Sequence, residues 1–170
     1  YPLTPAGGYT TGKELPSLSA AAPIAGIVTI NNTNTAGITL GTDATVFSWT
    51  ISPSATLRLN GKTLRMMGSF LNSAVTANTM GLDASVAGSK LSFIGNTLQT
   101  ITFGNQTFSS AITAPDLDIN NTFGGNGGSG GQVVSALGTV RNVNVMTGSF
   151  LQIGGAQLNV TGNITNDGTI

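Results

Sequence analysis

The chain has 170 residues, of which only 7% are charged, and its formal net charge is zero. Average soluble domains carry about 25% charged residues, so the composition gives no basis for electrostatic attraction to nucleic acid or anionic lipid. The chain contains neither Cys nor His. It therefore lacks disulfides, thiolate chemistry, the commonest general base and the commonest metal ligand.

The remaining composition predicts a single all-β domain. Hydrophobic residues make up 39% of the chain, which is too many for a disordered segment. No apolar run approaches the length of a membrane span, so we do not expect the chain to cross a bilayer. The abundant Thr favours strands, whereas Gly and Asn disfavour helices. Because the chain begins with Tyr1 and not Met, we expect processing or excision from a longer polypeptide, with an engineered boundary as the alternative.

Residues 1–23 differ from everything that follows. They hold four of the six prolines, together with three glycines. Proline cannot donate a hydrogen bond to a strand ladder, so this segment is predicted to be an extended lead-in or a cap on the first coil.

Short strands with one buried face are predicted from residue 24 onward, because apolar residues recur two positions apart. Runs such as Asn31–Asn34 interrupt them and supply corners. In the strand predicted at Val46–Ile51, Phe47 and Trp49 are expected on one face. Such a pair is either a platform for stacking sugars or part of the core.

Two pairs of similar segments within the chain indicate a repeating structure. The segment Leu57–Gly68 aligns with Leu151–Gly162 at a constant offset of 94 (151 − 57). The segment Gly68–Leu71 aligns with Gly148–Leu151 at an offset of 80 (148 − 68). Because the offsets differ, we expect coils of unequal length.

The middle of the chain alternates between clear and unclear segments. The apolar spacing of 71–90 is loose and leaves a short helix open, whereas 91–103 predicts strands. Later, Leu117 and Ile119 alternate with acidic residues. The glycine-rich stretch 124–131 predicts a loop at a corner, and it lacks the Lys-Ser/Thr ending of a phosphate-binding loop.

The final twenty residues, 151–170, repeat the strand pattern in pieces of three to five residues broken by Gly and Asn. We therefore expect residues 24–170 to form one parallel β-solenoid, a right-handed β-helix of about six or seven irregular coils. A β-sandwich or donor-strand pilin with 1–23 as the exchanged arm is the alternative. The pattern stops at Ile170 without a capping element, so we expect end-to-end contact with further repeats or with like molecules.

Several fragments resemble a known group of proteins. Leu158–Ile170 is similar to the repeats of bacterial secreted β-helical adhesins, in the style of filamentous haemagglutinin and autotransporter passengers. Leu91–Asn96, Gln99–Ile101 and Asp116–Asn121 look more like the giant surface proteins exported by the type IX secretion system, some of which act in gliding. The resemblance covers 24–170 in style. It implies an extracellular, mostly non-catalytic stalk, surface layer or adhesin, and it brings no defined binding residues.

Asp116, Asp118 and Asn120 place three oxygen-bearing side chains on one strand face, an arrangement that suggests a calcium site. An EF-hand loop would need Gly at its sixth position and Glu at its twelfth, where this chain has Asn121 and Gly127. We therefore favour a solvated outer face.

A cluster of positive charge is formed by Arg58, Lys62 and Arg65. Arg58 and Arg65 are predicted to point outward, because the leucines between them point inward. Such charges either contact an acidic glycan or protect a strand surface from unwanted pairing.

The five Asp and one Glu are scattered and form no convincing catalytic pair. We expect no enzyme activity, no cofactor and no metal. The predicted function is a structural or adhesive segment of a large secreted bacterial surface protein. A subunit of a self-assembling extracellular filament is the main alternative, and a carbohydrate-active or ligand-binding solenoid, such as an ice binder, is a further one. The expected partners are further repeats, surface glycans or the secretion machinery.

Overall fold

The computed structural model describes residues 9–11, 25–32, 36–73, 81–104, 114–123, 131–133, 137–153 and 157–170. These residues form strands and contain no helix. The strands are β1 (Tyr9–Thr11), β2 (Ala25–Ile30), β3 (Ile38–Leu40), β4 (Ala44–Ile51), β5 (Thr56–Arg58), β6 (Thr63–Met66), β7 (Phe70–Asn72), β8 (Gly81–Asp83), β9 (Lys90–Phe93), β10 (Gln99–Thr102), β11 (Asp116–Ile119), β12 (Gly131–Val133), β13 (Leu137–Val140), β14 (Val143–Val145), β15 (Leu151–Ile153), β16 (Gln157–Val160) and β17 (Ile164–Asn166). The all-β prediction is confirmed.

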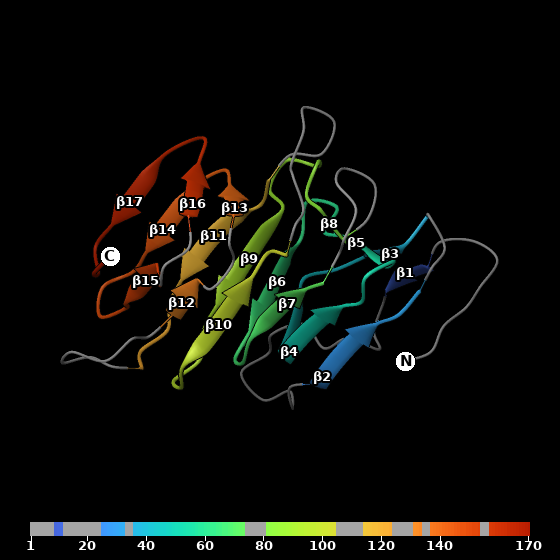
Figure 1. Cartoon of the computed structure of the whole chain (residues 1–170), viewed down its shortest axis with the longest axis horizontal. Helices are drawn as coiled ribbons and strands as arrows, with labels where there is room; N and C mark the ends of the chain where they lie inside the picture. Colours follow the sequence, from blue (N-terminus) through green and yellow to red (C-terminus); the bar gives the residue numbers. More distant parts are fainter. Residues whose placement is uncertain are drawn as a thin grey trace.

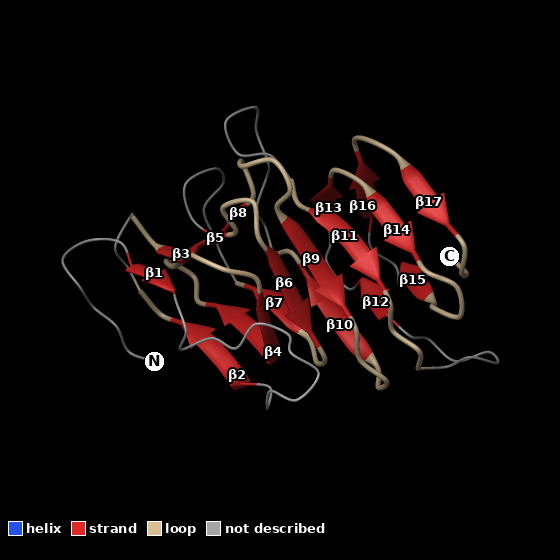
Figure 2. Cartoon of the chain, turned by 180° about the vertical axis from the view of Figure 1, so that it is seen from behind, coloured by secondary structure: helices blue, strands red, loops and turns tan. Residues whose placement is uncertain are grey.

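Every pairing between the described strands is parallel. One sheet has the order β1-β3-β5-β8, a second pairs β13 with β16, and the largest contains eleven strands. This large sheet is curled, with its first strands and its last strands at opposite ends of the molecule (Figures 1 and 2). An antiparallel sandwich, the alternative that the sequence left open, does not fit these pairings.

The eleven-stranded sheet has two wings joined by the long strand β4. Ala44–Val46 pairs with β6 and begins the wing β6-β9-β11-β14-β17. Trp49–Ile51 pairs with β7 on one side and with β2 on the other, and this wing runs β2-β4-β7-β10-β12-β15. The strands β5, β6 and β7 lie in the four-stranded sheet, the β6 wing and the β7 wing, in that order. The next three strands, β8, β9 and β10, repeat this order.

Residues in register form continuous apolar rows across the first wing. One row contains Ala44, Leu64, Leu91, Leu117, Val143 and Ile164. The row two positions further along contains Val46, Met66, Phe93, Ile119 and Val145, and it ends at the polar Asn166. Successive members of the first row are separated by 20, 27, 26, 26 and 21 residues (64 − 44, 91 − 64, 117 − 91, 143 − 117, 164 − 143). The spacing is therefore irregular, although the register is continuous.

The two pairs of similar segments found in the sequence do not follow this register. Leu57 lies in β5 of the four-stranded sheet, whereas Leu151 lies in β15 of the eleven-stranded sheet. The offset of 94 therefore joins different sheets. The offset of 80 stays within one wing, but Phe70 is in register with Ile153 through β10 and β12, which is an offset of 83 (153 − 70). Similar segments therefore recur in the chain, but they do not occupy equivalent positions in successive layers.

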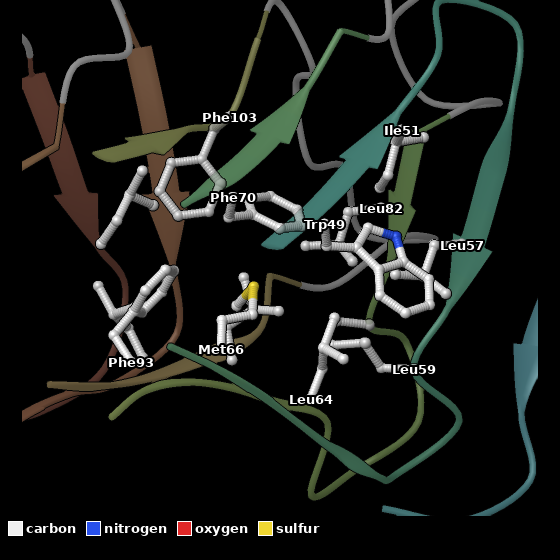
Figure 3. Packing of buried hydrophobic residues seen from close by; sticks show 14 of the residues in the cluster. Trp49, Ile51, Leu57, Leu59, Leu64, Met66, Phe70, Leu82, Phe93 and Phe103 are labelled. Carbon is white, nitrogen blue, oxygen red and sulfur yellow. The ribbon is translucent and has the colours of Figure 1, made fainter. Parts of the chain in front are cut away.

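The core lies between the wings and the four-stranded sheet. Figure 3 shows Trp49, Phe70, Met66 and Leu57 directed toward one another from different strands, and all four are essentially inaccessible to solvent. The rings of Phe70 and Phe103 are 6.3 Å apart and tilted by 57°, an arrangement that aromatic pairs favour.

Phe47 and Trp49 do not share a face, contrary to the sequence-based expectation. Trp49 is buried in the core, whereas Phe47 is exposed on the outside of β4. The two side chains separate because β4 turns between its two wings, so a period of two does not hold across the turn. The prediction of a platform for stacking sugars is therefore wrong, and the prediction that the pair belongs to the core is correct for Trp49.

A buried amide holds the bend between the wings. The Gln99 side-chain nitrogen donates to the carbonyl oxygens of Met66 at 2.9 Å and Gly68 at 2.6 Å. Its oxygen accepts from the Gly95 backbone nitrogen at 3.1 Å and from the Asn121 side chain at 2.6 Å. All four hydrogen-bonding positions of this buried amide are filled, as stability requires.

The corner between β5 and β6 uses left-handed backbone. Asn60 and Gly61 have φ values of 53° and 71°, and the Lys62 nitrogen donates to the Leu59 oxygen at 2.9 Å. Positive φ at both central positions suits Asn and Gly. This confirms the expectation that these residue types form corners.

Some sequence-based predictions fall largely outside the described residues. Within 1–23, only β1 is described, and it pairs with β3. Within the glycine-rich stretch, only Gly131 is described, at the start of β12. The described part of 71–90 contains the end of β7, all of β8 and the first residue of β9, and no helix.

Candidate interaction surface

Asp116 is engaged by a guanidinium group and is not poised for a metal. Arg141 donates to both of its carboxylate oxygens at 2.8 Å, and the Asn142 side chain donates at 2.7 Å. The hydrogen bonds from Arg141 are the main reason that the pKa of Asp116 lies below its usual value, although partial burial opposes the shift. The same pair raises the pKa of Arg141. Asp116 therefore stays ionised and paired.

Asp118 forms a second ion pair, with the Lys90 ammonium at 2.8 Å. Leu117 and Ile119 point inward as expected, but Asp118 is only 9% exposed, so the solvated outer face is wrong at this position. Among the residues that the structure describes, no group of three Asp or Glu side chains is placed to hold a metal ion.

The two arginines of the predicted positive cluster lie in different sheets, and each forms an ion pair, whereas Lys62 lies in the turn between them. Arg58 in β5 pairs with Asp83 in β8, directly across the strand pair, and also donates to the Ala36 oxygen at 3.1 Å. Arg65 in β6 pairs with Asp43 at 3.1 Å. The two arginines point outward as predicted, but their charges are balanced by aspartates on neighbouring segments. An acidic glycan would have to compete with these partners.

The strands β15, β16 and β17, here called the terminal edge, differ from these balanced surfaces. Sheet paths end at β15 and β17 within the described chain. Thr169 forms a parallel bridge with Phe150 and accepts from the Leu151 nitrogen at 2.9 Å, so the outer side of β15 is paired at its start. Ile164 is 58% exposed although it continues a row whose preceding member, Val143, is 2% exposed. Ile153 and Ile170 are exposed as well. An aliphatic row thus reaches solvent at this edge.

The strands of the terminal edge contain no charged residue. By contrast, β5, β6, β8, β9 and β11 all carry charges. Proteins commonly protect exposed edge strands with charged side chains or proline, since a bare edge is a template for another strand. The terminal edge lacks that protection and is the best candidate for an interaction surface.

Sequence reasoning predicted an uncovered end but not the residues that expose it. Ile153 and Ile164 lie in the same apolar-x-apolar pattern as the buried residues of the interior strands, so only the strand register shows that they lie at an edge.

Within the described part of the chain, no helix has the length and hydrophobicity to cross a lipid bilayer. No protein-family profile, curated protein or solved structure matches the chain.

Proposed function

We propose that the chain is a non-catalytic structural segment, a parallel β-solenoid of right-handed sense, belonging to a secreted bacterial surface protein. The observation that carries this proposal is the pair of apolar rows from Ala44 to Val143 and from Val46 to Val145, buried through five successive strands. In a solenoid each layer contacts only its neighbours, and stacking builds one continuous core. The right-handed sense follows the general preference of crossover connections between parallel strands.

The chemistry of the outer surface supports a structural role. The described ion pairs join neighbouring strands or segments, as Arg58 joins Asp83 and Lys90 joins Asp118. These pairs hold layers together and leave few free charges for a charged ligand. A stalk or adhesive segment needs persistence and length, which stacked layers provide.

The surface location can be tested in the source bacterium with antibodies raised against the folded chain. We expect them to label intact cells or the material that the cells secrete. Labelling that requires permeabilised cells would contradict the proposal. Incubation of the purified chain with neutral and acidic polysaccharides should release no oligosaccharides, and release above that of a heat-treated sample would favour the enzyme alternative.

A filament subunit is the second candidate function. The uncharged terminal edge favours it, since an exposed strand edge without charges promotes pairing between molecules. Growth of fibres with protein concentration, followed by light scattering, would support this candidate over a monomeric segment.

A further inference from the structure

The two wings of the large sheet differ in charge. None of the six strands of the wing β2-β4-β7-β10-β12-β15 contains a charged residue. In the other wing, β6, β9 and β11 all carry charges. The absence of charge is therefore a property of one whole wing and not of a single strand.

The outer side of β2, β4, β7 and β10, here called the hydroxyl face, carries rows of Thr and Ser. These strands lie side by side (Figure 1). The middle row consists of residues in register on the four strands, Thr29, Thr50, Leu71 and Thr102. Its members are exposed or half-buried, whereas their neighbours along the strands, such as Trp49 and Phe70, are buried. This alternation places the middle row on the outside.

Two further rows of hydroxyl groups flank the middle row. Two positions earlier on the same strands lie Ser48, Ser69 and Thr100, and two positions later lie Ser52 and Ser73. Hydrogen bonds between layers hold the earlier row in place. Ser48 Oγ accepts from the Ser69 nitrogen at 2.9 Å, and Ser69 Oγ accepts from the nitrogen and Oγ1 of Thr100 at 3.0 and 2.9 Å. The hydroxyl groups of this row therefore have fixed positions.

The spacing of the hydroxyl face is that of a regular array. Neighbouring strands lie about 4.8 Å apart, and residues on the same face recur about every 6.7 Å along each strand. Threonine adds rigidity, because its branched Cβ restricts χ1. A surface of ice also presents hydrogen-bonding oxygens on a fixed two-dimensional lattice with repeats of similar size. A charged side chain would keep its own hydration shell and lose free energy against such a lattice, but this wing has none.

We propose that the hydroxyl face binds ice, with the threonine hydroxyl and methyl groups of the middle row seated on the lattice of water molecules. A neutral sugar would instead require aromatic side chains on which its rings stack. Trp49 and Phe70 point into the core (Figure 3). Phe47 is exposed but follows the part of β4 that pairs with β6. The inference goes beyond the proposed structural role, since it concerns the outside of the layers and not their stacking.

Thermal hysteresis, the interval between the melting and freezing temperatures of a single ice crystal, tests the inference with the purified chain. We expect a measurable interval for the unmodified chain. Thr50→Lys places a charge at the centre of the array and should reduce the interval at least tenfold. The matched control is Asn144→Lys, at a half-buried position of β14 in the other wing, beside Asp118. It should leave the interval unchanged.

A second variant guards against loss of the fold. Leu71 is 40% exposed, so Leu71→Lys should keep the β spectrum in circular dichroism and the unfolding temperature of the unmodified chain. It should nevertheless reduce thermal hysteresis as Thr50→Lys does. Folded Leu71→Lys with full hysteresis, or an equal loss in Asn144→Lys, would overturn the inference.

The remaining outcomes separate ice from a neutral polysaccharide and from the proposed function. An unmodified chain with an intact β spectrum that neither shapes ice crystals nor shows hysteresis would overturn the inference. Binding to cellulose powder that Thr50→Lys abolishes, without any effect on ice, would also overturn it and assign the hydroxyl face to a neutral polysaccharide. Neither result changes the labelling of intact cells, so the proposed function stands or falls separately.

Discussion

The interior strands and the terminal edge share one residue pattern but have opposite surroundings. Leu91 in β9 and Ile164 in β17 occupy the same row, yet Leu91 is fully buried between β6 and β11, whereas Ile164 is largely exposed. The interior strands β9 and β11 are also joined by an ion pair, whereas β17 has no charged residue. Burial in this fold depends on the next layer and not on the residue itself. Within the described chain, Ile164 therefore continues an interior row without a further strand beside it.

The largest expected effect contrasts these two positions directly. Leu91→Ala removes buried methyl groups and leaves a cavity, so we expect a loss of about 3 kcal/mol in the free energy of unfolding. Ile164→Ala removes an exposed side chain and should change that free energy by less than about 0.5 kcal/mol. Urea denaturation of both variants, at a concentration that keeps the chain monomeric, measures the difference. Equal losses would mean that Ile164 is covered in solution.

A second contrast concerns amides in the bend and at the edge. Gln99→Leu would remove the side-chain partner of the Gly95 nitrogen and of the Gly68 oxygen, at a cost of about 2 kcal/mol in the free energy of unfolding. The Met66 oxygen would keep the Ile94 nitrogen as a donor. The control is Gln157→Leu, which removes an exposed amide whose side chain bonds Asn159 at the terminal edge. Gln157→Leu should leave the free energy of unfolding almost unchanged. The same denaturation experiment distinguishes them, and a neutral Gln99→Leu would show that the bend does not depend on this amide.

The smallest expected effect concerns the ion pair between β11 and the segment before β14. Asp116→Asn should destabilise the chain by about 1 kcal/mol at neutral pH, since it weakens a two-point hydrogen bond with a partly exposed Arg141. Because the pKa of Asp116 is lower in the folded state than the ordinary 3.8, its stabilisation is complete above that value. The stabilisation is lost as the pH falls through the lowered pKa.

The pH dependence provides the check on that prediction. The stability difference between the unmodified chain and Asp116→Asn should be full at pH 6 and should shrink as the pH falls below 3.8. Asp167→Asn, at an exposed position beyond β17, is the control and should change the free energy of unfolding little. A difference for Asp116 that does not change with pH would contradict the ion-pair explanation.

The local pattern could be predicted from the sequence, but the register could not. Alternation places Leu117 and Ile119 in the core, and this depends only on the two-residue period of a strand. Register depends on how the chain returns after each circuit, and the intervals between row members vary from 20 to 27 residues. A constant offset between similar segments therefore aligned Leu57 with Leu151, which lie in different sheets.

The residues that matter most at the bend and at the terminal edge were also hidden from the sequence. Gln99 resembles any surface glutamine until the bend brings Met66 and Gly68, more than thirty positions away, to its side chain. Asp118 is buried because Lys90 on the adjacent strand covers it. An apolar-x-apolar pair followed by Gly marks the register partners Leu64 and Leu91. Leu57-x-Leu59 with Gly61 has the same pattern in another sheet, so the pattern alone does not set the register.

The central claim, that stacked layers in register form this molecule, is tested most directly by removing one layer. Residues 65–91 are the 27 residues (91 − 64) that separate Leu64 from its register partner Leu91, so their deletion keeps the remaining rows aligned. Deleting 65–92 removes one residue more and turns Phe93 from the core to the outside, since a one-residue slip reverses every side chain. Circular dichroism and thermal unfolding compare the two. We expect the first deletion to retain a cooperatively unfolding β structure and the second to lose it, whereas equal loss in both would contradict the account.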